Sequence, residues 1–493
     1  MVKKHIIGVS GESGVGKTTI SKIISLFYGV GNTTNVSTGD LHKWDRKNEM
    51  WDKITHCNPD ANNLELGDTH LNYFLNNKPI YRSVYNHDTG YFNAPIKIEP
   101  KDIIIIDGLH AFYSDFSVNN INLKIYVDTD EVLRTHWKII RDTEERGYKY
   151  STVLDTINKR KIDSNVIREK QINCADVVIS LKPSKPILLL GDKNEEIDVE
   201  MSFSFATKLD DFSLFDFIKK YNDEFTNFIK YSEEIGNNLD FCQNGGGNIS
   251  TKINDMYMLI KASGYNMKDA YRLKAYSLID YSKVKTSLIS GNIKNDNELN
   301  TLILESVISD KIPSMETGFH VLLDKYVIHT HPIYLTTILC LENSKDIIKL
   351  IYSDYDYEYI DFVNPAFDLY EVINKTKKNK KIYFLENHGI IVTSNNIRDL
   401  INLFYDINNI SKKYINDLGF KDFNLSFSNK LIGDKYPFPD SVIFSNDISK
   451  KEILAAHNYV ITCGTHIGNL RYLEHNNLYK LKNMKSEKYR KTV

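Results

Sequence analysis

The chain has 493 residues, of which 42% are hydrophobic and 26% charged, so it holds ample material for packed cores and is not a disordered protein. Because a single core rarely grows beyond roughly 250–300 residues, we expect two or three domains. Lysine and arginine total 62 against 64 acidic residues, and a net charge of −2 gives no overall field for binding nucleic acid or an anionic membrane.

Cysteine usage and hydropathy indicate the compartment. The five cysteines are scattered, with no closely spaced pair, which is typical of a reducing environment. The N-terminus runs straight into a glycine-rich loop and lacks the apolar stretch of a signal peptide. No run approaches the roughly 18 apolar residues of a membrane span. We therefore expect a cytoplasmic protein without nucleic-acid or membrane partners.

The N-terminal part of the chain alternates between strand and helix patterns. Strands are predicted over 4–9, 102–107 and 121–127, and helices over 17–28 and 130–145. Such alternation favours right-handed crossovers and a mostly parallel sheet. The pattern weakens over 184–200, and a helical pattern then begins near residue 212. We place a domain boundary there, which gives domains 1–212 and 213–493, both of the α/β class.

A glycine-rich loop follows the first predicted strand. Residues 11–18 fit the pattern GxxxxGK[ST], in which Gly11, Gly14 and Gly16 let backbone N–H groups converge on phosphate oxygens. Lys17 would reach the β- and γ-phosphates, and the Thr18 hydroxyl would bind Mg²⁺. A strand before the loop and a helix after it supply the context that this motif requires. We therefore expect ATP and Mg²⁺ as cofactors.

Charged residues in the same domain are candidates for phosphoryl transfer. Asp107 ends a buried strand and would lie near the metal. Asp40 could accept a proton from the hydroxyl of an acceptor. Arg141, on the predicted helix 130–145, and Arg146, which directly follows it, offer two guanidinium groups for phosphate charge.

Several stretches of this domain, taken in order, resemble the phosphoribulokinase/uridine kinase family, and its phosphoribulokinase branch most. They are residues 42–46, 58–64, 78–81, 85–90, 106–110 and 141–147. The resemblance implies a P-loop kinase fold and phosphoryl transfer from ATP to a sugar hydroxyl. It assigns Asp40 as the base. It places four side chains at the phosphates or the acceptor: His42, Arg46, Arg141 and Arg146.

Two features depart from this family. Asp40 lies two residues before His42, where the family usually has three. The segment Arg82–Tyr85 looks inserted between two family motifs near the acceptor. These departures leave the identity of the acceptor sugar open, and we first expect a pentulose-like sugar.

Histidines in the C-terminal domain form a candidate metal site. His329 and His331 lie on the predicted strand 326–333, where alternation places both imidazoles on one face. His388 follows another predicted strand, 382–385, and could complete the set. Three histidines with an open position are typical of a catalytic zinc site. Glu316, upstream, could move the proton of an enolisation beside such a metal.

Loops before these histidines could bind an anion. The loop 245–250 and the segment 262–264 offer backbone amides and hydroxyls. Several stretches, taken in order, resemble the class II aldolase/adducin family: 247–250 of this loop, 259–264, 314–316, 329–332, 387–389 and the tail 483–490. The resemblance implies zinc, or another divalent transition metal, on His329, His331 and His388, with Glu316 as acid/base. It implies four residues that hold a substrate phosphate: Asn248, Ser263, Gly264 and Ser314.

The resemblance also implies a homo-oligomer, with a four-fold tetramer as the usual form. A second serine often follows the first phosphate-binding one in this family, and Met315 stands in its place. A further catalytic group, often a tyrosine, would come from a neighbouring subunit, and the sequence does not identify it.

We interpret the chain as a bifunctional carbohydrate enzyme. An ATP-dependent sugar kinase would be fused to a zinc-dependent aldolase that cleaves or forms a ketose phosphate. The alternatives keep the kinase and make the second domain a sugar-phosphate 4-epimerase, a dehydratase or a non-catalytic oligomerisation module. A further alternative is a P-loop switch that regulates the aldolase.

Overall fold

The computed structural model describes residues 4–490, except 87–88, 194, 196, 207–208, 210, 377–379, 429–430 and 445–449. His87 and Asp88, in the predicted motif 85–90, therefore lie outside the described residues. The chain forms two compact units, Met1–Asn222 and Asp223–Val493. Helix α6, Ser213–Gly236, crosses from one unit to the other. The domain boundary predicted at residue 213 stays a prediction. No helix among the described residues is long and apolar enough to cross a membrane.

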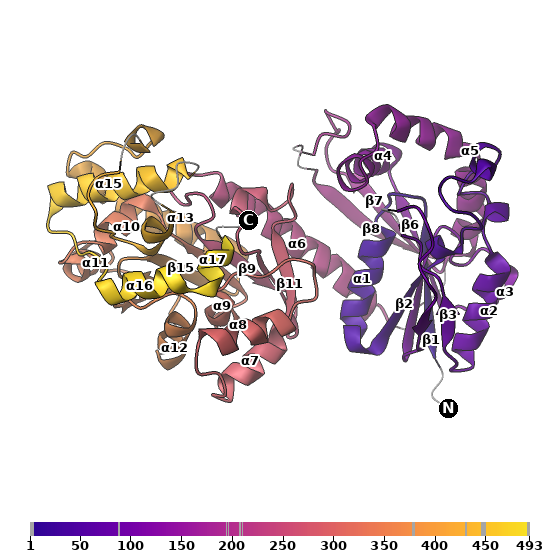
Figure 1. The fold of residues 1–493 in the computed structure, drawn as a ribbon, viewed down its shortest axis with the longest axis horizontal. Coiled ribbons are helices and arrows are strands. Elements are labelled where there is room, and N and C mark those ends of the chain that lie inside the picture. Colours follow the sequence, from indigo (N-terminus) through magenta and orange to yellow (C-terminus); the bar gives the residue numbers. More distant parts are fainter. Residues whose placement is uncertain are drawn as a thin grey trace. The chain divides into compact units, whose positions relative to one another are not determined.

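The N-terminal unit contains a six-stranded sheet of order β2-β5-β1-β6-β7-β8 (Figure 1). All neighbouring strands are parallel except β8, which pairs antiparallel with β7. The sheet strands are β1 His5–Gly11, β2 Thr33–Ser37, β5 Ile103–Gly108, β6 Leu123–Thr129, β7 Val177–Pro183 and β8 Val199–Phe205. The predicted mixed α/β fold with a mostly parallel sheet is confirmed.

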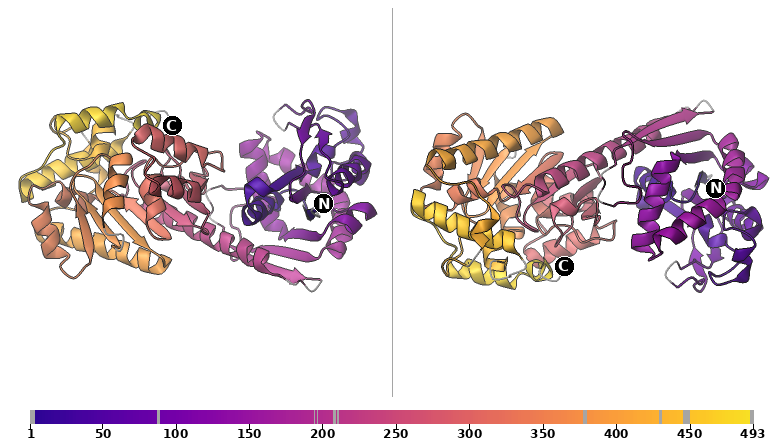
Figure 2. Two further views of the ribbon diagram at one scale, coloured as in Figure 1. Left: turned by 90° about the horizontal axis from the view of Figure 1, so that it is seen from below. Right: turned by 90° about the horizontal axis from the view of Figure 1, so that it is seen from above.

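Helices cover both faces of this sheet because its central strands are apolar on both sides (Figure 2). Ile7 packs in one buried cluster with Ile23 of α1, and Ile6 packs in another with Phe74 of α2. The helices of this unit are α1 Lys17–Tyr28, α2 Leu64–Leu75, α3 Asp115–Asn120, α4 Glu131–Ile140 and α5 Tyr150–Cys174. A separate hairpin is formed by β3 Ile80–Arg82 and β4 Ile96–Ile98.

The strand order explains where a ligand would bind. β1 lies between β5 and β6, and the chain leaves its carboxyl end into the glycine-rich loop. In parallel sheets, the crevice outside the carboxyl ends of such central strands is the usual binding place. The loop and the end of β5 therefore open into one region.

The second unit contains a seven-stranded sheet of order β11-β10-β9-β12-β15-β14-β13, in which only β13 and β14 are parallel among the described pairs. Its strands are β9 Asn248–Lys252, β10 Tyr257–Lys261, β11 Tyr276–Asp280, β12 Tyr326–Thr330, β13 Tyr357–Ile360, β14 Ile382–Leu385 and β15 Gly389–Ser394. Its helices after α6 are α7 Tyr281–Ile289, α8 Asp296–Glu305, α9 Thr317–Leu322, α10 Ile333–Leu339, α11 Ser344–Ile351, α12 Phe367–Lys375, α13 Ile397–Asp417, α14 Pro439–Phe444, α15 Lys451–Ile467, α16 His475–Asn483 and α17 Lys485–Arg490.

The β12 strand is shorter than the sequence predicts. The pattern predicts a strand over 326–333, whereas β12 ends at Thr330 and α10 begins at Ile333. Pro332 is the N-cap of α10, and proline is compatible with a helix start but cannot donate to a ladder. His329 therefore lies in the strand, and His331 lies just beyond it.

Candidate functional sites

The loop that follows β1 has the geometry of a phosphate-binding loop. Gly14 and Gly16 have φ angles of 93° and 91°, in the left-handed region that favours glycine. A Cβ at Gly11 would lie 2.5 Å from the Val127 carbonyl oxygen, so a larger residue does not fit there. Helix α1 begins at Lys17, and its first-turn N–H groups border the loop.

Two predicted ATP- and Mg²⁺-binding residues lie beside the predicted carboxylate. The Thr18 hydroxyl donates to Asp107 Oδ2 at 3.4 Å. Burial lowers the pKa of Lys17 to about 8, and its Nζ donates to the Glu12 carbonyl oxygen at 2.5 Å. Burial raises the pKa of Asp107, which the charge of Lys17 partly offsets. An ammonium, a hydroxyl and a carboxylate thus meet at the loop, the set that a Mg²⁺–nucleotide needs.

Asp40 lies in a short 3₁₀ turn, Thr38–Leu41. Both ends of the segment Arg82–Tyr85, which looks inserted relative to the family, contact its carboxylate. Its Oδ1 accepts from the Tyr85 backbone N–H at 2.9 Å, and its Oδ2 lies 3.5 Å from Arg82 Nη2. Burial raises the pKa of Asp40, while the Tyr85 N–H and the Arg82 charge lower it. Arg82 is 5% exposed and donates to the Ser37 carbonyl oxygen at 2.5 Å. The segment Arg82–Tyr85 therefore positions the predicted base.

The predicted phosphate and acceptor residues line one pocket. His42, Arg46, Arg141 and Arg146 all border it, together with Lys17. The structure thus brings together residues that come from three separate segments of the sequence. Asp40 and Asp107 are not among the residues that line this pocket.

A buried carboxylate, Asp142, holds three cations of this pocket. Its oxygens lie 2.7 Å from Lys138, 2.8 Å from Arg141 and 3.2 Å from Arg146. Burial alone would raise the pKa of Asp142, but Lys138 and Arg141 outweigh it, so the net shift is downward. Residues 141–145 form a π-helical turn that continues α4, a distortion often found at functional sites.

Sequence reasoning missed four residues of this site. Lys138 lies three residues before Arg141 on the predicted helix, so helical spacing could have identified it. Asp142 lies within a quoted motif, whereas nothing in the sequence pattern marks Arg160 of α5, which also lines the pocket. Arg82 lies in the segment that departs from the family.

The three predicted metal-binding histidines meet in the second unit. His329, His331 and His388 each place a ring nitrogen within 4.8 Å of the others, and all three are buried. His329 Nδ1 donates to the Ile390 carbonyl oxygen at 2.9 Å, because that oxygen can only accept. Its Nε2 lone pair then faces His331 Nε2 at 3.2 Å. Burial lowers the pKa of His329, which keeps it neutral and able to bind a metal.

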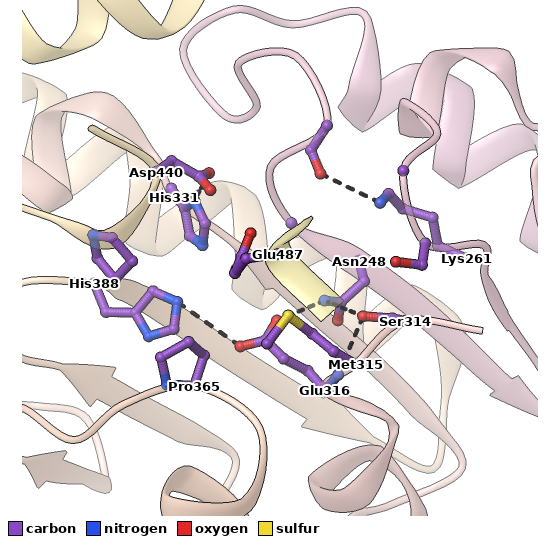
Figure 3. A pocket seen from close by; sticks show the side chains of 15 residues that line it. Asn248, Lys261, Ser314, Met315, Glu316, His331, Pro365, His388, Asp440 and Glu487 are labelled. Carbon is purple, nitrogen blue, oxygen red and sulfur yellow. Dashed lines mark hydrogen bonds and ion pairs between the residues drawn. The ribbon is translucent and has the colours of Figure 1, made fainter. Parts of the chain in front are cut away.

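A carboxylate lies beside these imidazoles. Glu316 Oε2 is 3.4 Å from His329 Nε2, and Oε1 is 3.8 Å from His388 Nε2. Asn248 Nδ2 donates to Oε2 at 2.7 Å, as Figure 3 shows. Within the described part of the chain, the buried Oε1 atom has no hydrogen-bond partner. Two facing Nε2 lone pairs and an orphaned carboxylate oxygen together fit a divalent cation.

His320 of α9 fixes the orientation of Asn248. Its Nε2 hydrogen-bonds Asn248 Oδ1, and its Nδ1 lies 2.7 Å from Ser250 Oγ. Because Asn248 Oδ1 can only accept, His320 Nε2–H donates, and Nδ1 accepts from Ser250. The amide nitrogen of Asn248 is thereby turned toward Glu316.

The predicted anion-binding residues line one pocket with two of the three predicted metal-binding histidines (Figure 3). Asn248, Ser263, Gly264 and Ser314 border it, beside His331 and His388. The Ser314 hydroxyl oxygen accepts from Asn248 Nδ2 at 3.2 Å. The residues predicted for the phosphate and for the metal are thus parts of one site.

Three charged residues of this pocket were not predicted: Lys261, Asp440 and Glu487. Lys261 ends β10, within a quoted motif, and its Nζ donates to the Gly245 carbonyl oxygen at 3.3 Å. Asp440 comes from the short helix α14, and no local pattern in the sequence marks it, whereas Glu487 comes from α17 and lies within the quoted tail 483–490. A Cβ at Gly246 would lie 2.8 Å from Asp440 Oδ2, so glycine allows that carboxylate to approach.

Family models match the two parts of the chain separately. Residues 6–187 match the phosphoribulokinase/uridine kinase family, and residues 227–415 match the class II aldolase and adducin N-terminal domain. The two resemblances seen in the sequence are therefore confirmed.

Individual relatives match the first part. The chain is 34% identical to phosphoribulokinase from Synechocystis sp. over 192 residues, which cover 39% of this chain and 57% of that protein. It is 31% identical to uridine kinase from Anoxybacillus flavithermus over 182 residues, which cover 36% of this chain and 86% of that protein. The chain spans just over half the length of the phosphoribulokinases that it matches.

Among solved structures, an N-terminal class II aldolase domain of a conserved protein from Thermoplasma acidophilum is similar at 22% identity, with a TM-score of 0.35. It covers 42% of this chain and 96% of that one. Phosphoribulokinase from Rhodobacter spheroides is similar at 20% identity, with a TM-score of 0.36, over 44% of this chain and 85% of that one.

Proposed function

We propose that this chain is a bifunctional carbohydrate enzyme. The proposal starts from the two family matches: residues 6–187 belong to the phosphoribulokinase/uridine kinase family, and residues 227–415 match the class II aldolase and adducin N-terminal domain. The N-terminal unit would transfer a phosphoryl group from ATP to a hydroxyl of a pentulose-like sugar. The second unit would cleave or form a ketose phosphate in a metal-dependent aldol reaction.

In the kinase half, the contacts support a division of roles. Lys17 and the glycine-rich loop would bind the phosphates of ATP, and Thr18 with Asp107 would hold Mg²⁺. Asp40, held by Arg82 and Tyr85, would accept the proton of the acceptor hydroxyl. The cations around Asp142 would bind phosphate charge on the nucleotide and the acceptor.

In the aldolase half, His329, His331 and His388 would hold zinc or another divalent transition metal. When bound, such a metal supplies a Lewis acid that polarises a substrate oxygen. Glu316 would move the proton at the carbon next to the substrate carbonyl. Asn248, Ser263, Gly264 and Ser314, beside Lys261, would hold the substrate phosphate.

One observation carries this proposal: three buried imidazoles meet one another, two of them beside Glu316, and Glu316 lines the same pocket as the predicted anion-binding residues. A non-catalytic module would have no need for a buried carboxylate oxygen facing imidazole nitrogens, because desolvating such a group costs stability. An epimerase or dehydratase would use the same metal site, and the products of the reaction distinguish these activities from cleavage.

The first experiment follows ³¹P NMR of the zinc-loaded protein with Mg-ATP and a panel of ketoses and ketose phosphates. We expect a new phosphomonoester that is absent with Lys17→Ala, and a triose phosphate that is absent with His388→Ala. A phosphorylated sugar that never shortens, even when dihydroxyacetone phosphate and aldehydes are supplied, would contradict the aldolase half. We also propose a cytoplasmic homo-oligomer, with a tetramer expected from sedimentation.

A further inference from the structure

The C-terminal segment, residues 416–493, follows the part of the chain that matches the aldolase model, yet it supplies two carboxylates to the metal pocket. Asp440 comes from α14 and Glu487 from α17. Glu487 is 2% exposed although it lies only six residues before the last residue given, Val493. In Figure 3 its side chain projects from α17 into the pocket.

Apart from Glu487, the titratable side chains of the pocket have roles that their contacts indicate. The titratable side chains that line it, among the described residues, are Lys261, Glu316, His331, His388, Asp440 and Glu487. His331 and His388 belong to the metal triad, and Asp440 is hydrogen-bonded to His331 Nδ1 at 2.9 Å. Lys261 is a cation beside the anion-binding loop, where it donates to the Gly245 carbonyl oxygen.

Glu316 cannot serve every proton transfer of an aldol reaction. It is fixed by Asn248 and lies beside the imidazoles, where it can reach the carbon next to the carbonyl. Cleavage also requires a base at the hydroxyl of the carbon that leaves as an aldehyde. That hydroxyl lies on the other side of the breaking bond, so a second group is needed.

We propose that Glu487 is this second group, a catalytic carboxylate supplied by the C-terminal helix of the same chain. This inference rests on the proposed aldolase function. The family resemblance implied that a neighbouring subunit supplies the further catalytic group. The present inference assigns that role to Glu487 of the same chain.

The step balances without an oxidant or reductant. In cleavage of a ketose 1-phosphate, Glu487 takes the proton of the C4 hydroxyl, and the O–H electron pair forms the C4 carbonyl. The C3–C4 bond breaks, and its electrons move toward the C2 oxygen. Glu316, in its acid form, then donates a proton to C3, which gives dihydroxyacetone phosphate and an aldehyde. Condensation runs through the same transfers in reverse.

A partial reaction separates the two carboxylates. With dihydroxyacetone phosphate alone in D₂O, exchange of a C3 hydrogen needs Glu316 but no group at C4. We would measure this exchange by ¹H NMR and cleavage by coupled assay. The zinc-loaded full chain is compared with three variants, Glu487→Gln, Glu487→Asp and Glu316→Gln. Lys488→Gln is the matched control, because Lys488 is an exposed neighbour of Glu487 in α17. Zinc content of each variant reports on the integrity of the site.

We expect Glu487→Gln to lose cleavage about 10²-fold or more while keeping zinc and exchange, with partial rescue in Glu487→Asp. Glu316→Gln should lose both activities, and Lys488→Gln neither. Cleavage by Glu487→Gln within threefold of the wild-type rate would overturn the inference, and so would equal losses of exchange and cleavage. A wild-type protein that neither exchanges nor cleaves would instead overturn the aldolase function itself.

Discussion

His331 and Asp440 form a buried pair that joins the metal site to the C-terminal segment. His331 Nδ1 lies 2.9 Å from Asp440 Oδ2, and both side chains are less than one-tenth exposed. A carboxylate that accepts from Nδ1 leaves the Nε2 lone pair for a metal and raises the basicity of the ligand. Asp440 is thereby placed to orient a proposed metal ligand although 109 residues separate the two in sequence.

Replacing Asp440 should weaken metal binding. We expect Asp440→Asn to lower zinc affinity by about 10–100-fold, because the amide removes the negative charge that stabilises the ring orientation. Competition with a chromophoric chelator measures this directly. Asp434→Asn, at an exposed position of the same segment, serves as the control and should bind zinc as tightly as the wild type. Equal affinity of all three proteins would contradict the assigned role of Asp440.

The pH dependence of the kinase should report on Arg82. Burial raises the pKa of Asp40, so the acid limb of kcat/KM should lie above the ordinary carboxyl range near 3.9. The positive charge of Arg82 favours ionised Asp40, so its removal raises that pKa further. Arg82→Met should therefore shift the acid limb to higher pH. Asp40→Asn should lose about 10²–10⁴-fold in kcat.

The pH–rate profile of Lys97→Met provides the comparison for Arg82→Met. Lys97 lies in β4, opposite β3, and forms an exposed ion pair with Glu99. Its removal should leave the acid limb in place. An acid limb that is unchanged in Arg82→Met would show that the Arg82–Asp40 contact does not govern the base.

Loss of Asp142 should destabilise the N-terminal unit. Asp142 and Lys138 are both less than one-tenth exposed, and removing one partner of a buried ion pair leaves an uncompensated charge. We expect Asp142→Ala to lower the free energy of unfolding by about 3 kcal/mol. Tryptophan fluorescence in urea measures this unit alone, because Trp44, Trp51 and Trp137 all lie within it.

Glu144→Ala is the matched control for Asp142→Ala. Glu144 pairs with Lys193 at the surface, where ion pairs contribute about 0–1 kcal/mol. Similar urea midpoints for the two variants would show that the Asp142 cluster contributes no more to stability than a surface pair.

Metal removal should separate the two activities. A protein treated with a chelator and then dialysed should recover sugar phosphorylation on addition of Mg²⁺ alone. Aldol cleavage should stay lost until zinc, cobalt or manganese is added, because imidazole sites bind transition metals far better than Mg²⁺. Cleavage that returns with Mg²⁺ alone would contradict the assignment of the histidine triad to the reaction.

Much of each fold followed from the sequence because the relevant patterns are local. The predicted helix over 17–28 coincides with α1, and the predicted strand over 382–385 coincides with β14. The helix predicted over 130–145 is instead α4 followed by a π-helical turn. Asp142 contacts Lys138 and Arg146 at the four-residue spacing that helical periodicity anticipates, but that periodicity does not anticipate the change of pitch at residues 141–145.

The sequence by itself determined the glycine-rich loop and the His329–His331 pair, because short covalent spacing sets where their atoms lie, and the family resemblance indicated the predicted anion-binding residues. Only the tertiary structure decided that Arg82 meets Asp40 and that Asp440 and Glu487 enter the metal pocket. These residues lie tens to more than a hundred positions from their partners. Their contacts depend on how separate helices and strands pack, and no local pattern of residues encodes that packing.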